Sequence, residues 1–165
     1  MTEPAELRPA TPADAVALTE LEREANLVAL GHVFPADEHA FPAAEVEERW
    51  RRVLGEPDVT VEVVDGRGGL LAFVAYDERL LRHLAVHPTV WGRGWGRALV
   101  ERAASRMGSQ PRLWCLVDNR RARSLYEHLG WRETGRSQSA EWPPYPAEIE
   151  YERDEPDGLP SSSEG

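Results

Sequence analysis

Residues 86–97 read VHPTVWGRGWGR, the most informative stretch of the chain. It ends an apolar run from Leu80 that is typical of a strand, and it leads into a segment with helical apolar spacing that ends near Met107. Three glycines alternate from Gly92 to Gly96. Glycines let the backbone approach a ligand closely, and the free N–H groups at a helix start attract anions. The stretch therefore predicts a phosphate or diphosphate site.

Two common nucleotide motifs do not fit this glycine loop. A dinucleotide fingerprint requires a third glycine at the place of Arg97. A P-loop ends in Gly-Lys-Ser/Thr, and the chain contains no such triplet. A tight loop that binds no ligand is the structural alternative that remains at this point.

The remaining segments alternate between strand and helix patterns, which predicts an α/β fold with a mixed sheet and helices on its faces. A three-strand antiparallel meander forms its first half, and a helix, a strand, a helix and two strands follow. Residues 1–153 form a single domain in this interpretation, and the polar residues 154–165 are expected to be a disordered tail. The predicted strands are 6–8, 59–64, 70–76, 80–86, 113–117, 131–134 and 147–151, and the predicted helices are 11–31, 42–54, 97–107 and 119–129.

Composition narrows the class of function. The formal net charge of −10 argues against nucleic acid as a partner, because phosphate backbones require a basic surface. Neither a membrane span nor a secretory signal is found, and Cys115 is the only cysteine, so we expect a cytoplasmic protein. Arginines gather from Arg93 to Arg106 and from Arg112 to Arg123, where an anionic ligand could bind.

Two motifs resemble those of the GNAT superfamily. The segment from Leu84 through the glycine loop is similar to its acyl-CoA motif, Gln/Arg-x-x-Gly-x-Gly/Ala, in which Gly94 and Gly96 match and Trp91 replaces the usual Gln or Arg. Residues 119–131, which begin at Asn119 and include Tyr126, resemble the family's later motif. With the strand before the loop, the resemblance covers about a third of the chain.

The resemblance implies an acetyl-CoA-dependent N-acetyltransferase that moves an acetyl group from the thioester to a primary amine in a ternary complex, with no metal. It also implies a mostly antiparallel sheet whose strands ending at Val86 and Val117 splay apart around the pantetheine arm. The cofactor-binding residues that it implies are Leu84, Ala85, Val86, Gly92, Arg93, Gly94, Trp95, Gly96, Arg97 and Asn119.

Tyr126 matches the family's usual general acid, and a packed helix aromatic is the alternative. No acid lies on the strand 113–117, where some relatives carry a base. His83 is the first candidate for that base, since an imidazole accepts a proton near neutral pH. Glu62, Asp118 and Glu148 are further candidates, and a water chain without a dedicated base is also compatible with the chemistry.

The acceptor is expected to bind near the loop 31–41 and the segment 142–146, which supply aromatic rings. Asp37, Glu38, Glu45 and Glu148 are candidate partners of an ammonium group. A small amine, an amino acid, an antibiotic amine and a protein amino terminus all remain open. A non-catalytic acyl-CoA sensor and a protein-interaction module are the alternatives to an enzyme, and a homodimer is compatible with each.

Overall fold

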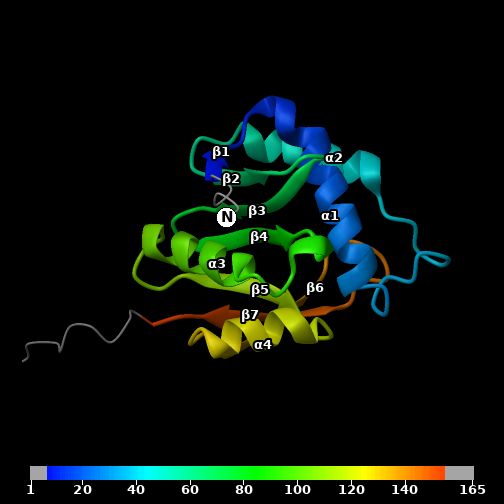
Figure 1. Cartoon of the computed structure of the whole chain (residues 1–165). Coiled ribbons are helices and arrows are strands. Elements are labelled where there is room, and N and C mark those ends of the chain that lie inside the picture. Colours follow the sequence, from blue (N-terminus) through cyan, green and yellow to red (C-terminus); the bar gives the residue numbers. More distant parts are fainter. Residues whose placement is uncertain (1–6, 155–165) are drawn as a thin grey trace, which may run out of the picture.

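The computed structural model describes residues 7–154 and contains one seven-stranded sheet with the order β1-β2-β3-β4-β5-β7-β6 (Figure 1). All neighbouring strands are antiparallel except β4 and β5, which are parallel. The strands are β1 (Leu7–Pro9), β2 (Thr60–Asp65), β3 (Leu70–Tyr76), β4 (Leu80–Val86), β5 (Arg112–Leu116), β6 (Arg132–Ser139) and β7 (Ala147–Glu152). The mixed α/β fold and the antiparallel meander β2-β3-β4 are confirmed. Of the predicted tail, all residues after Asp154 lie outside the described part of the chain.

Helices cover both faces of the sheet (Figure 1). Apolar residues of α1 and α2 pack on one face around Trp50 and Phe73, and those of α3 and α4 pack on the other around Leu99 and Tyr151. The apolar side chains recur at helical spacing, so each helix buries one stripe against the strands. The helices are α1 (Ala15–Ala29), α2 (Ala43–Leu54), α3 (Trp95–Arg106) and α4 (Arg120–His128), with short 3₁₀ turns at Pro12–Asp14 and Pro88–Val90.

The pairing of β4 changes along its length, and this change creates the opening that holds the site. Ala75 pairs with His83 and Tyr76 pairs with Leu81, so Arg82 is an extra residue in β4. Such a bulge turns the following side chains to the other face. On its other side β4 pairs with β5 only at Leu80 and Leu81, and the two parallel strands share no further pair.

The predicted boundaries of the helices and strands are close to those observed, except at the end of β6 and the start of α3. The strand predicted for 131–134 extends to Ser139 in β6, whose side chains are almost all exposed and show no apolar alternation. α3 begins at Trp95, two residues before the expected start, because Gly94 already serves as its N-cap. These two differences leave the predicted order of elements unchanged.

Candidate active site

A groove of about 400 Å³ lies where β4 and β5 separate. Of the ten predicted cofactor residues, nine line this groove, whereas Arg93 is exposed and does not. One wall comes from the carboxyl-terminal half of α1, which sequence reasoning had not assigned to the cofactor site. The lining residues are Ala25, Asn26, Ala29, Leu30, Leu84, Ala85, Val86, Val90, Trp91, Gly92, Gly94, Trp95, Gly96, Arg97, Asn119, Arg121, Ala122 and Leu125.

The floor of the groove carries free main-chain donors at the start of α3. Gly94 caps the helix with φ 87°, a left-handed conformation that a side chain would strain. The first helical hydrogen bond runs from the Ala98 N–H to the Gly94 carbonyl at 3.0 Å. The N–H groups of residues 95–97 therefore have no helical acceptor, and the helix dipole makes this terminus favourable for an anion.

α3 and α4 approach each other closely beside these donors. A Cβ atom added at Gly96 would meet Leu125 Cδ2 at 3.3 Å, which is tighter than ordinary van der Waals contact. The absence of a side chain at position 96 therefore lets the two helices meet at the groove. A side chain at position 96 would have to displace the end of Leu125, a residue that lines the groove.

Trp91, which replaces the usual Gln or Arg of the motif, closes one edge of the groove. Its indole Nε1–H donates to the Val86 carbonyl at 2.7 Å, so that it fixes the end of β4. The guanidinium carbon of Arg121 lies 4.0 Å from the centroid of its ring. Trp91 thus connects the end of β4 with the first turn of α4.

The start of α4 is held by further hydrogen bonds. The Asn119 side chain accepts a hydrogen bond from the Ala122 N–H at 3.2 Å and so caps the first turn of α4. The His32 imidazole lies 2.8 Å from the Asp118 carbonyl, so its Nε2–H can donate to it and tie the segment after α1 to the β5–α4 turn. The two walls of the groove are therefore connected outside β4 and β5.

Tyr126 lies in the core rather than in the lining of the groove. Its side chain is 7% exposed, and its ring centroid lies 6.1 Å from those of Trp131 and Tyr151. Burial, with a smaller contribution from Cys115, raises the pKa of the phenol, so Tyr126 is protonated at neutral pH. Its hydroxyl has no hydrogen-bond partner among residues 7–154, and its neighbours Ala122 and Leu125 line the groove.

His83 packs against Trp50 under α2, with the ring centroids 5.1 Å apart, and it lines neither the groove nor the second cavity described below. Burial and the positive charges of Arg49 and Arg82 lower the pKa of its imidazole to about 3. The side chain is therefore neutral at physiological pH, but its low pKa makes it a weak base. This environment disfavours the predicted role of His83.

The further base candidates occupy different surroundings. Glu62 is buried, and it receives hydrogen bonds from Tyr76 at 3.0 Å and from Arg102 at 2.8 to 3.1 Å. Burial alone raises the pKa of Glu62, but these bonds outweigh it and hold the pKa below its usual value. Glu148 receives a hydrogen bond from Gln138, and neither Glu148 nor Asp118 lines the groove. None of the three is a free carboxylate in the groove.

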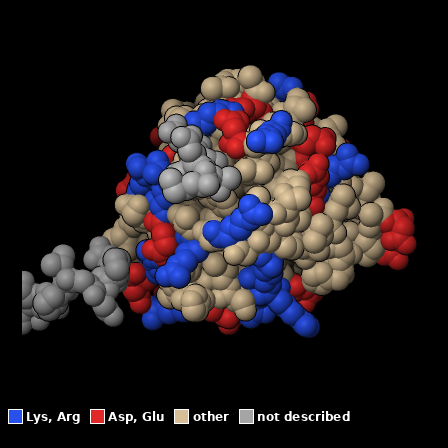
Figure 2. Space-filling model, viewed as in Figure 1, with Lys and Arg blue, Asp and Glu red and all other residues tan. Residues whose placement is uncertain are grey.

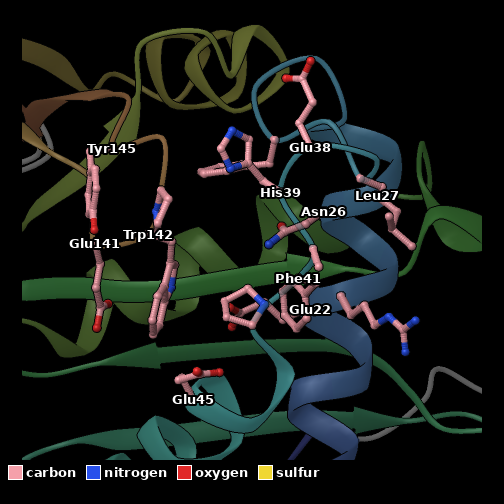
Figure 3. Close-up of a pocket in the computed structure, with 16 residues that line it drawn as sticks. Glu22, Asn26, Leu27, Glu38, His39, Phe41, Glu45, Glu141, Trp142 and Tyr145 are labelled. Carbon is pink, nitrogen blue, oxygen red and sulfur yellow. The ribbon is translucent and has the colours of Figure 1, made fainter.

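A second cavity of about 560 Å³ adjoins the groove at Asn26, which lines both (Figure 3). Of the acids predicted to hold an acceptor, Glu38 and Glu45 line this cavity, while Asp37 and Glu148 do not. The predicted aromatic segments meet here as well. The lining residues are Glu22, Arg23, Asn26, Leu27, Phe34, Ala36, Glu38, His39, Ala40, Phe41, Pro42, Glu45, Glu141, Trp142, Pro143 and Tyr145.

Charge is unevenly distributed over the surface. Figure 2 shows basic side chains over the part of this face where Figure 1 draws α3 and α4, despite the formal net charge of −10. The second cavity has the opposite character, because four glutamates and one arginine line it. Within residues 7–154 no helix is both long and apolar enough to cross a membrane.

The comparisons with known proteins agree with this geometry. Residues 56–133 match the family model described as an acetyltransferase (GNAT) domain, whereas no curated protein sequence matches the chain. A GCN5-related N-acetyltransferase from Rhodopseudomonas palustris has a similar structure, with a TM-score of 0.76 at 17% identity over 93% of this chain and 98% of that one.

Two further structures share the fold. The PaiA N-acetyltransferase of Thermoplasma acidophilum in complex with coenzyme A gives a TM-score of 0.68 at 15% identity, over 92% of this chain and 99% of that one. The ribosomal-protein-S18-alanine N-acetyltransferase of Escherichia coli gives a TM-score of 0.68 at 20% identity, over 95% of this chain and 99% of that one. Residues 56–133 therefore match the GNAT acetyltransferase family, and the chain as a whole has the GNAT fold.

Proposed function

We propose that the chain transfers an acetyl group from acetyl-CoA to a primary amine within a ternary complex. The observation that carries the proposal is the groove at the β4–β5 separation, which leads to the free N–H groups of residues 95–97. A diphosphate fits these donors, and the main-chain groups of β4 between residues 82 and 85 that face away from β3, where β5 no longer pairs, suit the amides of a pantetheine arm. Arg97 and Arg121 line the groove and add positive charge.

The reaction needs few protein groups. The neutral amine attacks the thioester carbonyl carbon, a C–N bond forms, and the carbonyl oxygen carries the negative charge of the tetrahedral intermediate. The C–S bond then breaks, the sulfur leaves as a thiolate that takes up a proton, and the nitrogen loses one.

We assign donation of the proton to Tyr126, because its phenol is protonated at neutral pH, has no hydrogen-bond partner among residues 7–154 and lies on α4 beside Ala122 and Leu125, which line the groove. The weak basicity of His83 leads us to assign removal of the amine proton to water in place of the imidazole.

Cofactor binding is tested by thermal unfolding with and without CoA and acetyl-CoA. A ligand present at about 100 times its Kd stabilises the native state by about 2.7 kcal/mol, so the unfolding midpoint should rise. Gly94→Ala should weaken this response, because position 94 has φ 87°. Gly68→Ala is the matched control, since a Cβ atom at Gly68 meets nothing within 4 Å and its φ is ordinary. An equal response in both variants would contradict the proposed site.

Transfer is tested by following release of the free CoA thiol with a panel of primary amines. The chain contains no lysine, so thiol released in these assays cannot come from acetylation of its own lysine side chains. Amine-dependent thiol release with matching formation of the N-acetyl product supports the proposal. Tight CoA binding without release by any amine or peptide amino terminus would instead favour a non-catalytic acyl-CoA sensor.

A further inference from the structure

The second cavity has an apolar wall built from two separate parts of the chain. In Figure 3, Trp142 and Tyr145 on the β6–β7 connection stand opposite Asn26 and Phe41, on the side of α1. Leu27 and Tyr145 are 50% and 58% exposed, so both present apolar surface to this cavity. A volume of about 560 Å³ suits a small organic molecule, and aromatic rings favour both apolar groups and ammonium ions.

The lining of the cavity also carries more acid than base, because its one arginine, Arg23, stands against four glutamates. Glu22 forms an ion pair with Arg49, whose Nη2 lies 2.5 Å from Glu22 Oε1. Glu38, Glu45 and Glu141 are exposed and have no ion pair within residues 7–154. They come from three elements: the segment between α1 and α2, the first turn of α2, and the β6–β7 connection. Acid groups on three sides favour positive charge at more than one point of a bound ligand.

Asn26 marks the point where this cavity meets the groove. It is the one residue on both lining sets, and its side-chain amide has no hydrogen-bond partner among residues 7–154. An amide can accept a hydrogen bond from an amine N–H and donate one to a carbonyl oxygen. The reacting nitrogen and the thioester would therefore meet near Asn26.

From these features we infer that the cavity binds the acceptor and selects a small amine with a second positive charge on an apolar spacer, an inference that rests on the proposed function. The reacting nitrogen must be neutral to attack, so the unpaired carboxylates do not serve it in the reactive complex. They serve a second ammonium group, while Phe41, Trp142 and Tyr145 contact the spacer. A carboxylate at the far end of the acceptor is disfavoured by the same glutamates.

Three amines of equal chain length separate the contributions of charge and spacer: diaminooctane, octylamine and aminooctanoate. Diaminooctane should exceed octylamine in kcat/KM by about fivefold or more, mainly through a lower KM, since each exposed ion pair contributes modestly. Aminooctanoate should be the poorest of the three. Equal kcat/KM values for diaminooctane and octylamine would overturn the inference, as would a peptide amino terminus that reacts faster than diaminooctane.

Matched variants locate the selectivity. Glu45→Gln should reduce the preference for diaminooctane over octylamine, whereas Glu48→Gln on the same helix should leave it unchanged, because Glu48 is exposed and does not line the cavity. Glu141→Gln should act like Glu45→Gln from the opposite wall. Trp142→Ala should raise KM for both amines while the Kd for CoA stays the same. Equal effects of Glu45→Gln and Glu48→Gln would place the selectivity elsewhere.

A measurement of amine binding tests this inference independently of the proposed function. Calorimetric titration of diaminooctane into the CoA-bound protein, in which no transfer occurs, reports on the cavity alone. Binding that Glu45→Gln weakens and Glu48→Gln does not would support the inference even if no amine were acetylated. Absence of binding, together with thiol release by another amine, would overturn the inference and leave the proposed function intact.

Discussion

The Arg121 guanidinium lies over the Trp91 indole, with its central carbon 4.0 Å from the ring centroid. Both residues line the groove, and Trp91 is in turn bonded to the end of β4 through the Val86 carbonyl. A planar guanidinium can stack on an aromatic ring while the N–H donors in its own plane stay free. Arg121 is thus held at the groove with N–H groups that can donate hydrogen bonds to a phosphate.

We therefore expect Arg121→Ala to weaken CoA binding about tenfold, the equivalent of about 1.4 kcal/mol for a lost charged hydrogen bond. Arg121→Lys should recover only part of the affinity, because an ammonium group does not stack in the same way. Calorimetric titration of CoA measures both changes. Arg79→Ala, outside the groove, is the control, and a loss of the same size in that variant would exclude a specific role for Arg121.

Tyr126→Phe removes only the hydroxyl proposed to protonate the leaving thiolate. General acid catalysis contributes about 10²- to 10⁴-fold, so kcat should fall within this range while the Kd for CoA stays the same. Steady-state kinetics with thiol detection and CoA titration together give the two values. An unchanged kcat would show that Tyr126 is only a packed aromatic of α4, as its 7% exposure also allows.

His83 should make the fold sensitive to acid. The unfolded imidazole takes up a proton below a pKa of about 6.5, whereas the folded one does so only near its lowered pKa of about 3. The unfolded state therefore binds more protons between these values, so stability present above pH 6.5 is lost as the pH falls toward 3.

Denaturant unfolding measured between pH 7 and pH 4 should show a smaller loss of stability in His83→Gln than in the wild type. His128→Gln, at an exposed position on α4, should follow the wild type. Parallel pH profiles for all three proteins would contradict the lowered pKa of His83.

The ion pair with Arg102 stabilises the ionised form of the buried Glu62. Arg102→Gln should destabilise the fold by about 2 kcal/mol, because it leaves a buried carboxylate with Tyr76 as its remaining hydrogen-bond donor. This value is below that for a fully buried pair, since the Arg102 side chain is 38% exposed. The double variant Glu62→Gln/Arg102→Gln should be more stable than Arg102→Gln alone. A double variant with the summed losses of both single variants would contradict this coupling.

The sequence predicted the fold and the glycine loop because both depend on local signals. Short apolar segments bounded by turn residues indicate β2 to β4, and Gly94 at the end of the loop caps the start of α3. The strand β6 was predicted too short because its outward-facing side chains are polar and its pairing comes from β7. A strand held by its neighbour leaves no periodic signal in its own residues.

The site was only partly predictable for the same physical reason. The loop residues were predicted, but Ala25, Asn26 and Ala29 were not, because they reach the groove only through the packing of α1 against the sheet. The burial of Tyr126 and the low pKa of His83 depend on Tyr151, Trp50 and Arg49, which lie on other elements. Such surroundings arise from tertiary contacts that a motif does not encode.

The most direct test of the central claim is a CoA titration followed by two-dimensional ¹H–¹⁵N NMR of the full chain. If the groove binds the cofactor, the largest changes should occur at the amides of residues 84–86, 92–97 and 119–122, with Trp95, Gly96 and Arg97 shifted by the diphosphate. Changes confined to the cavity around Glu45 and Trp142, or no change at saturating CoA, would contradict the assignment of this groove as the acetyl-CoA site.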